Sequence, residues 1–181
     1  AKQLRDNALF VSGLINLEMG GRGVNPYQPP NIWEPVGYVD SNTRYYLQDH
    51  GPALYRRSLY TFLKRTAPAP FMANFDAPMR DECTCTRTVS NTPQQALTLL
   101  NDPEFFEAAR LFSQSVVKTV RTRIGEGEEP VPWDRMYIIE AYKRALARPP
   151  HEKEIVSLEK FLSEQRNYFD ANPADAEKVL K

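Results

Sequence analysis

The sequence predicts an all-α fold, an irregular helical bundle with long proline- and glycine-rich loops in its first half. Apolar residues recur at intervals of three and four along most segments, which is the spacing of one helix face. Proline-led helix starts follow one another in the second half, and the alternating pattern of half-buried strands is nearly absent. We therefore expect a single helical domain over 1–181, made of a helix-loop-helix (1–66), an extended polar loop (67–91), antiparallel helices (92–169) and a C-terminal segment (170–181).

The first element is expected to be a helix over residues 2–19. Gly20 ends a run of apolar residues at helical spacing, namely Leu4, Ala8, Val11 and Ile15. The following segment is rich in Pro, Gly and Asn, which predicts a loop. Because large aromatic side chains gain from burial, we expect three of them to pin this loop to the core: Tyr27, Trp33 and Tyr38.

A second helix is expected over residues 52–66, since its apolar side chains have helical spacing and Pro52 suits a first turn. Its other faces carry basic side chains: Arg56, Arg57, Lys64 and Arg65. The next stretch, APAPFMANFDAPMRDE, predicts an extended, proline-stiffened excursion. At this length we expect it to be functional or wrapped tightly against the body of the domain.

Helix signals are clearer in the second half. Thr92 and Gln95 form a capping box around Pro93, which predicts a short helix over 93–100. Asp102 precedes another proline and begins a helix that is expected to extend to about residue 123. Later helix starts are expected at Asp134, at His151, which stands where a cap belongs, and at Asn172.

Composition limits the classes of function. The 23 basic and 23 acidic residues give a formal net charge of +0, so no global field draws in nucleic acid or an anionic membrane. We expect no transmembrane segment, because no apolar run is long enough, and no signal peptide, because the opening AKQLRDNALF lacks that pattern. Helical periodicity begins at once, so we expect a piece of a longer polypeptide. Cys83 and Cys85 form no disulfide framework, and free thiols are expected.

Five runs, in order, carry a resemblance to a known family: QLRDNALFVSGLIN, NPYQPPNIWE, HGPALYRRSLYTFLKRT, FDAPMRDECT and SNTPQQALTLLNDPEF. From about Gln3 to Leu162 the chain resembles a planctomycete-type C-terminal domain of unknown function. The resemblance implies a large, exported multidomain protein that often carries a cytochrome-c-like domain, and hence a location in the cell envelope or periplasm. It also implies neighbouring domains of the same polypeptide as partners, and haem in such a neighbour. It implies no activity, because the family has no established one.

The chain departs from the family pattern around the cysteines, where that pattern resembles F-D-A-P-N-R-E-x-C-T-x-R-R. Met79 stands in place of the Asn, and Asp81 in place of the Glu. Cys83 matches the pattern, whereas Cys85 stands where a valine-like residue is common. The resemblance therefore argues against a role for a pair of cysteines.

Haem and metal sites find little support in the sequence itself. No C-x-x-C-H motif is present, so haem ligation would fall to His50 and a methionine, and a lone histidine in a polar loop is more often a surface residue. Two distant histidines and one C-x-C match no zinc spacing. Calcium would have to bind without the spacing of an EF-hand, through Asp40, Asp49, Asp76 or Asp81. We expect no cofactor and no metal in this chain.

The stretch Phe75–Asn91 carries the candidate chemistry. One hypothesis makes it part of a hydrolase-type or redox-linked enzyme, with glycans as a substrate class and with five candidate catalytic residues: Asp76, Arg80, Glu82, Cys83 and Arg87. Neighbouring carboxylates are suited to acid–base hydrolysis. The two arginines would favour a thiolate at Cys83, for which His50 is a candidate base.

The other hypothesis, which we favour, makes this stretch a buried polar hinge. Asp76, Arg80 and Arg87 would tie it to the helices through charge-assisted hydrogen bonds. The basic face of the second helix would dock on the acidic residues between 76 and 82. The function expected from this hypothesis is a non-catalytic module of a large cell-envelope protein, whose exposed Tyr, Trp and Pro-rich loop provides contact surface.

Overall fold

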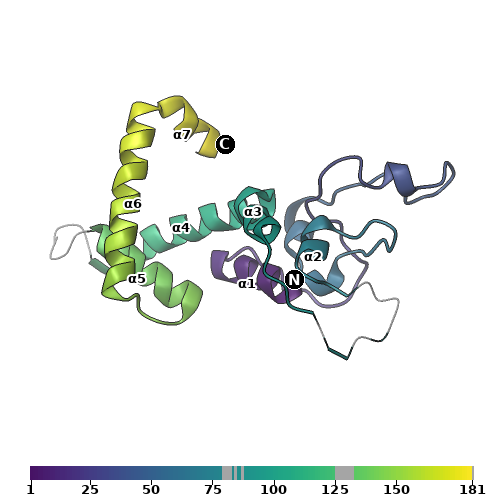
Figure 1. Ribbon diagram of the computed structural model, residues 1–181, viewed down its shortest axis with the longest axis horizontal. Coiled ribbons are helices and arrows are strands. Elements are labelled where there is room, and N and C mark those ends of the chain that lie inside the picture. The colour runs from purple at the N-terminus through teal and green to yellow at the C-terminus, as the bar shows by residue number, and fades with distance from the viewer. Residues whose placement is uncertain (79–82, 84, 87, 125–132, 181) are drawn as a thin grey trace. The chain divides into compact units, whose positions relative to one another are not determined.

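A computed structural model describes residues 1–78, 83, 85–86, 88–124 and 133–180. Within these residues the fold is all-α, as predicted (Figure 1). Two isolated backbone bridges occur among them, one between Asn16 and Arg56 and one between Val24 and Thr61. The helices are, in order, α1 (Lys2–Ser12), η1 (Glu34–Val36), η2 (Gly51–Tyr55), η3 (Ser58–Tyr60), α2 (Pro70–Asn74), α3 (Pro93–Asn101), α4 (Pro103–Ile124), α5 (Trp133–Leu146), α6 (Glu152–Ala171) and α7 (Pro173–Leu180), where η denotes a 3-10 helix.

The chain forms two compact units, Ala1–Phe112 and Ser113–Lys181. A folding domain can contain two such units, so the single domain predicted over 1–181 stays a prediction, as does the antiparallel order of helices over 92–169. None of the helices in the described residues has both the length and the apolar character of a bilayer-spanning segment.

Helix α1 is shorter than the predicted helix over 2–19 and buries a different face. It ends at Ser12 because Gly13 adopts the left-handed conformation, with φ 80° and ψ 9°, and donates its N–H back to the last turn. The predicted apolar stripe began at Leu4, which is instead exposed. The buried face lies one residue along and consists of Arg5, Leu9 and Ser12. An arginine therefore occupies a core position of α1.

The helix predicted over 52–66 does not form, and two short 3-10 helices, η2 and η3, stand in its place. An α-helix would join the N–H of Ser58 to the carbonyl of Leu54. Instead, the Ser58 N–H donates to Asp6 Oδ1 at 2.7 Å. The Leu54 carbonyl accepts from Arg5 Nη2 at 2.8 Å. Two adjacent charged residues of α1 thus take both ends of one helical hydrogen bond, so a long-range contact overrides local helix propensity.

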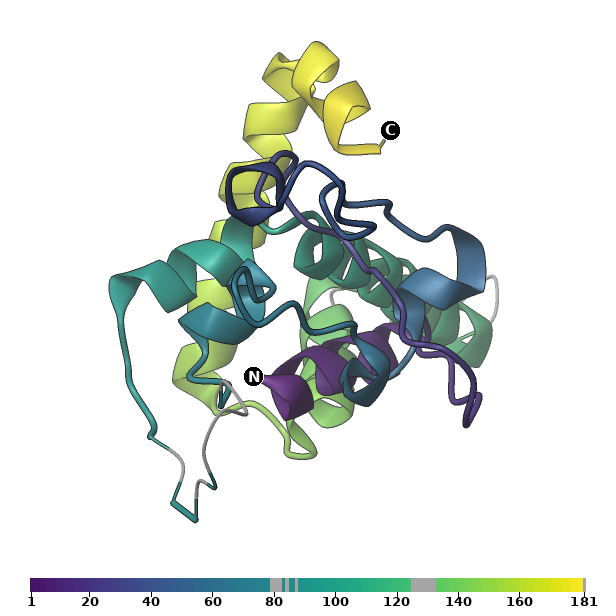
Figure 2. The ribbon, with the colours of Figure 1, turned by 90° about the vertical axis from the view of Figure 1, so that its right-hand side faces the viewer.

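The chain between α1 and η2 follows an irregular course, drawn in purple to blue in Figure 2, around the buried Trp33. The indole ring contacts the rings of Tyr46 and Phe62, with centroid separations of 4.8 and 5.7 Å. Tyr27 is half-buried. The predicted pinning by aromatics is therefore confirmed for Trp33 and Tyr27, but it is wrong for Tyr38, which is 89% exposed.

The stretch predicted to be extended over 67–91 contains a helix, α2, which begins at Pro70 because proline suits the first helical position. Helix α2 contacts α3. Its buried side chains join a core cluster of the first unit that comprises Ala69, Phe71, Met72 and Phe105.

The helix starts predicted at Thr92, Asp102, His151 and Asn172 are confirmed, whereas Asp134, the start predicted for the helix before His151, lies within the first turn of α5, which begins at Trp133. Helix α3 begins with the expected capping box of Thr92 and Gln95. Helix α6 begins after His151, whose backbone N–H donates to Glu154 Oε2 at 2.7 Å. In the second unit the buried apolar side chains include Val116, Val120, Ile138 and Ile155.

Candidate functional site

Asp76 closes the base of the predicted functional stretch. Its backbone is left-handed, with φ 55°. Its Oδ2 accepts from the Ser90 N–H at 2.8 Å and from the Ser90 hydroxyl at 2.7 Å. These bonds, the hydroxyl bond first, lower the pKa of Asp76. The carboxylate is therefore held ionised, and it accepts two hydrogen bonds from a residue of its own loop.

Gln95 adds a second connection at the same place. Its side chain is buried, and its Nε2 donates to the Asn74 carbonyl and to Ser90 Oγ, both at 2.9 Å. Ser90 Oγ thus accepts from Gln95 while it donates to Asp76. The two ends of the loop are therefore joined by Asp76, which follows α2, by Ser90, and by Gln95 in the first turn of α3.

The buried polar hinge is wrong for the described part of this loop. Cys83, Cys85 and Val89 are exposed. The bonds between Asp76 and Ser90 bring the two ends of the loop together, and the exposed Cys83, Cys85 and Val89 lie between these ends in the sequence. The loop meets water at these positions, and its described backbone needs no buried partners there.

The five candidate catalytic residues are not brought together by the described structure. Asp76 lies at the loop base, and Cys83 is exposed with a free thiol. Arg80, Glu82 and Arg87 lie outside the described residues. The enzyme hypothesis for these residues therefore stays a prediction.

The remaining candidates for metal or haem are scattered. His50 and Asp40 are exposed, while Asp49 is engaged with Arg22 and accepts from the Asn25 N–H at 2.8 Å. Asp81 lies outside the described residues. Within the described part of the chain, no group of three or more His, Cys, Asp or Glu residues forms a candidate metal site.

Two of the basic residues predicted to dock on the acidic loop, Arg56 and Lys64, have partners elsewhere. Arg56 is buried, donates to the carbonyls of Arg22 and Glu18 at 3.0 and 3.1 Å, and lies 3.9 Å from the ring centre of Tyr60. Lys64 Nζ donates to the carbonyl of Thr43 at 2.7 Å. The predicted docking is therefore wrong for these two cations, which fix the irregular first half of the chain.

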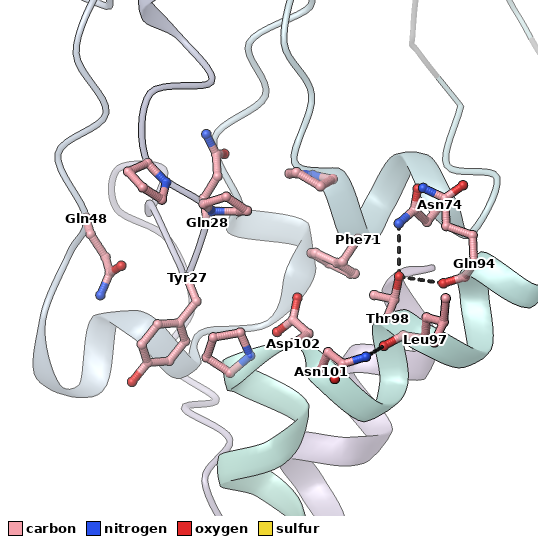
Figure 3. A pocket seen from close by; sticks show the side chains of 14 residues that line it. Tyr27, Gln28, Gln48, Phe71, Asn74, Gln94, Leu97, Thr98, Asn101 and Asp102 are labelled. Carbon is pink, nitrogen blue, oxygen red and sulfur yellow. Dashed lines mark hydrogen bonds between the residues drawn. The ribbon is translucent and has the colours of Figure 1, made fainter.

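The sequence prediction missed a pocket of about 610 Å³ in the first unit (Figure 3). Its lining side chains come from the segment 27–30, from Gln48, from α2 and from the stretch 94–103. The walls combine prolines and the ring of Phe71 with several side-chain amides. Asp102 is the charged residue among the residues that line it. The sequence indicated the helix over 93–100 and the helix start at Asp102, which form one wall, but it did not show that the fold places the segment 27–30, Gln48 and α2 opposite them.

Two hydrogen bonds of α3 fix one wall of this pocket. Asn74 Nδ2 donates to Thr98 Oγ1 at 2.9 Å, which ties α2 to α3. Asn101 Nδ2 donates to the Leu97 carbonyl at 2.9 Å. Both bonds are drawn in Figure 3. The wall therefore presents amide groups in fixed orientations rather than a freely moving surface.

Burial raises the pKa of Asp102, although the N–H groups of Glu104 and Phe105 oppose this shift. The Glu104 N–H donates to Asp102 Oδ1 at 2.9 Å, which makes Asp102 the cap of α4. The pocket therefore contains a partly desolvated carboxyl group whose charge is compensated mainly by backbone N–H groups.

Comparison with known proteins gives one family. A model described as "PSD1: Protein of unknown function (DUF1553)" matches residues 1–162. No curated protein matches the chain, and no solved structure matches it.

Proposed function

Because the chain belongs to the PSD1 family of proteins of unknown function (DUF1553), we propose its role from the surface that it presents. The domain is a non-catalytic interaction module that packs against neighbouring domains of a large cell-envelope protein. The sequence resemblance, which extends to planctomycete-type proteins with a cytochrome-c-like domain, suggests the kind of parent protein.

Large apolar side chains stand exposed on one short segment of the first unit, which we call the 36–47 surface. The three most exposed are Tyr38, Val39 and Leu47, at 77–89%. Val36 and Tyr45 add to them, at 43% and 57%. A concentration of apolar and aromatic side chains on a surface is typical of a protein contact.

The backbone beneath this surface is held in place. Tyr46 donates its hydroxyl to the Pro26 carbonyl, and its ring packs edge-on against buried Trp33. Lys64 Nζ donates to the Thr43 carbonyl at 2.7 Å and lies 4.9 Å from the centre of the Trp33 ring. A contact surface that is fixed before binding loses less conformational entropy when a partner covers it.

The proposal is tested by hydroxyl-radical footprinting of this chain alone and of the longer polypeptide that contains it. Tyr38, Tyr45 and Leu47 should be protected in the longer polypeptide and modified in residues 1–181. Met19, which is 82% exposed and lies outside the 36–47 surface, is the internal control and should be modified equally in both.

A matched pair of variants tests the same point by affinity. Tyr38→Ser with Leu47→Ser should weaken binding of the isolated domain to the rest of its polypeptide, whereas Val89→Ser, at a position 91% exposed on the loop before α3, should not. Equal modification of Tyr38 in both samples would refute the proposal, and so would equal affinities of the two variants.

A further inference from the structure

The pocket of Figure 3 is lined by residues outside the 36–47 surface and contains a carboxylate, that of Asp102, for which the described residues provide no direct ion pair. Asp102 caps α4, and Figure 3 shows its carboxylate pointing into the space between Tyr27 and Phe71. The charge of Arg5 acts on this carboxylate through space and opposes the effect of burial, but no direct ion pair with Asp102 is found among the described residues. The lining of the pocket thus contains one carboxyl group and no basic residue.

Arg5, whose charge acts on Asp102, is engaged by other groups. Arg5 donates two hydrogen bonds to Glu104, one from Nε at 2.7 Å and one from Nη2 at 2.5 Å. Its other N–H groups donate to the Leu54 and Arg56 carbonyls, each at 2.8 Å, and to Ser58 Oγ at 3.3 Å. Arg5 therefore cannot turn to Asp102 without breaking a buried ion pair. A basic side chain of another molecule would therefore supply the direct ion pair that Asp102 lacks among the described residues.

From this arrangement we propose that the pocket receives a lysine or arginine side chain of a partner polypeptide, with Asp102 as the ion-pair partner. This site and this partner chemistry go beyond the apolar contact proposed above. An anionic ligand would find no cation among the lining residues and would be repelled by Asp102.

The rest of the lining suits such a side chain. Because the Asn101 Nδ2 is used by the Leu97 carbonyl, its Oδ1 remains as an acceptor for an N–H donor. The ring of Tyr27, held by a 3.1 Å bond from its hydroxyl to Glu107 Oε2, gives an aromatic wall on which a cation is stabilised. Phe71 and the prolines provide apolar contact for the aliphatic stem of Lys or Arg.

The surroundings favour a polypeptide over a free amine. Leu97, which lines the pocket, is 58% exposed, and Leu100, one turn further along α3, is 72% exposed. These side chains form an apolar margin next to the charged pocket. A polypeptide can place one basic side chain in the pocket and cover this margin with its neighbours, in the manner of a buried anchor within a contact.

The test is an NMR titration of the ¹⁵N-labelled chain with four probes. Three are peptides, acetyl-Gly-Gly-X-Gly-Gly-amide with X as Arg, Lys or citrulline, and the fourth is N-acetyl-argininamide. The Arg and Lys peptides should produce saturable shifts at residues 94–103. Citrulline keeps the shape of arginine without its charge, so its peptide should bind at least about tenfold more weakly.

Asp102→Asn is the decisive variant, because Asn caps a helix as well as Asp does and the substitution removes only the charge. This variant should bind the Arg peptide at least about tenfold more weakly than the unmodified chain does. Asp170→Asn, the same substitution at an exposed site on α6, should leave binding unchanged. Should Asp102→Asn unfold the chain, Leu97→Arg replaces it: this exposed position would place a competing cation at the pocket and should abolish binding with the fold intact.

Three results would overturn the proposal: equal binding of the Arg and citrulline peptides, unchanged binding by folded Asp102→Asn or Leu97→Arg, or no saturable shift with any probe. Binding of N-acetyl-argininamide as tight as that of the Arg peptide would overturn the polypeptide part, because it would show a site for small cations. None of these results bears on the 36–47 surface, whose own test uses different residues.

Discussion

Arg5 and Glu104 form a two-point ion pair inside the first unit, although they are 99 positions apart in the sequence. Arg5 Nε lies 2.7 Å from Glu104 Oε2, and Nη2 lies 2.5 Å from Oε1. Both side chains are buried, at 0% and 3% exposure. The same guanidinium donates to two carbonyls around η2, so one side chain joins α1, α4 and the segment between them.

Glu104→Ala is predicted to destabilise the protein strongly. Removing one partner of a buried ion pair leaves the other charge uncompensated, which costs about 3–5 kcal/mol. The free energy of unfolding, measured by urea denaturation and circular dichroism, should fall by about that amount. Glu152→Ala breaks the exposed pair with Arg135 and is the control, expected to change stability little.

A double variant separates charge from packing. Arg5→Met with Glu104→Leu removes both charges and keeps apolar volume, so it should be more stable than Glu104→Ala. If the double variant is instead the less stable of the two, the hydrogen bonds of Arg5 to the Leu54 and Arg56 carbonyls, rather than the uncompensated charge, dominate at this site.

Local signals were enough to predict the helices of the second half. The capping box at Thr92 and the cap position of His151 lie within a few residues of the helices that they start, so no distant contact is needed to recognise them. The all-α class followed from the same short-range periodicity.

The first half could not be predicted in this way, because distant residues decide its conformation. The Leu54 carbonyl and the Ser58 N–H bond to side chains of α1 instead of to each other. Periodicity counts apolar residues, so it could not place Arg5 in the core. The pocket is equally invisible in the sequence, because its walls come from segments on either side of these contacts.

Acid is predicted to remove a specific contribution at the start of α6. Arg148 donates to both Glu154 oxygens, at 2.8 and 2.7 Å, and with the His151 N–H it lowers the pKa of Glu154 from 4.5 to about 2. A folded-state pKa below the unfolded value stabilises the protein above pH 4.5, and this contribution is lost as the pH falls from 4.5 toward 2.

Glu154→Gln should therefore lower the melting temperature at pH 6 and differ less and less from the unmodified protein as the pH falls below 4.5. Thermal melts followed by circular dichroism across this range check the prediction. Glu164→Gln, at an exposed site on the same helix, is the matched control. If the difference in melting temperature between Glu154→Gln and the unmodified protein stays constant down to pH 2.5, the ion pair does not have the assigned role.

Gly37→Ala is predicted to destabilise the protein by crowding its neighbours. A Cβ there would lie 3.0 Å from Arg44 Cα and 3.2 Å from the Trp33 carbonyl oxygen, both too close for carbon and oxygen contacts. The backbone of Gly37 is extended, so the cost is steric alone. Gly37→Ala should reduce the free energy of unfolding by about 1–3 kcal/mol, the usual cost of overpacking.

Gly23→Ala is the control for this substitution in the same unit, because its Cβ would meet its nearest atom, the Tyr60 carbonyl oxygen, at an ordinary 3.4 Å. Urea denaturation should show little change for Gly23→Ala. Equal losses for the two variants would mean that glycine itself, rather than the space beside Arg44, matters at these positions.

Cys83 and Cys85 are predicted to react with Ellman's reagent in the native protein as fast as in urea, because both thiols are exposed. The reagent should release two equivalents of its coloured thiolate per chain, one for each cysteine, without a lag. Each of the single variants Cys83→Ser and Cys85→Ser leaves one thiol. The two remaining thiols should react with Ellman's reagent at similar rates. Slow labelling in the native state would restore the buried hinge that the sequence suggested. A Cys83 that reacts far faster than Cys85, with a rate that persists to lower pH, would instead support an activated nucleophile at that position and the enzyme hypothesis.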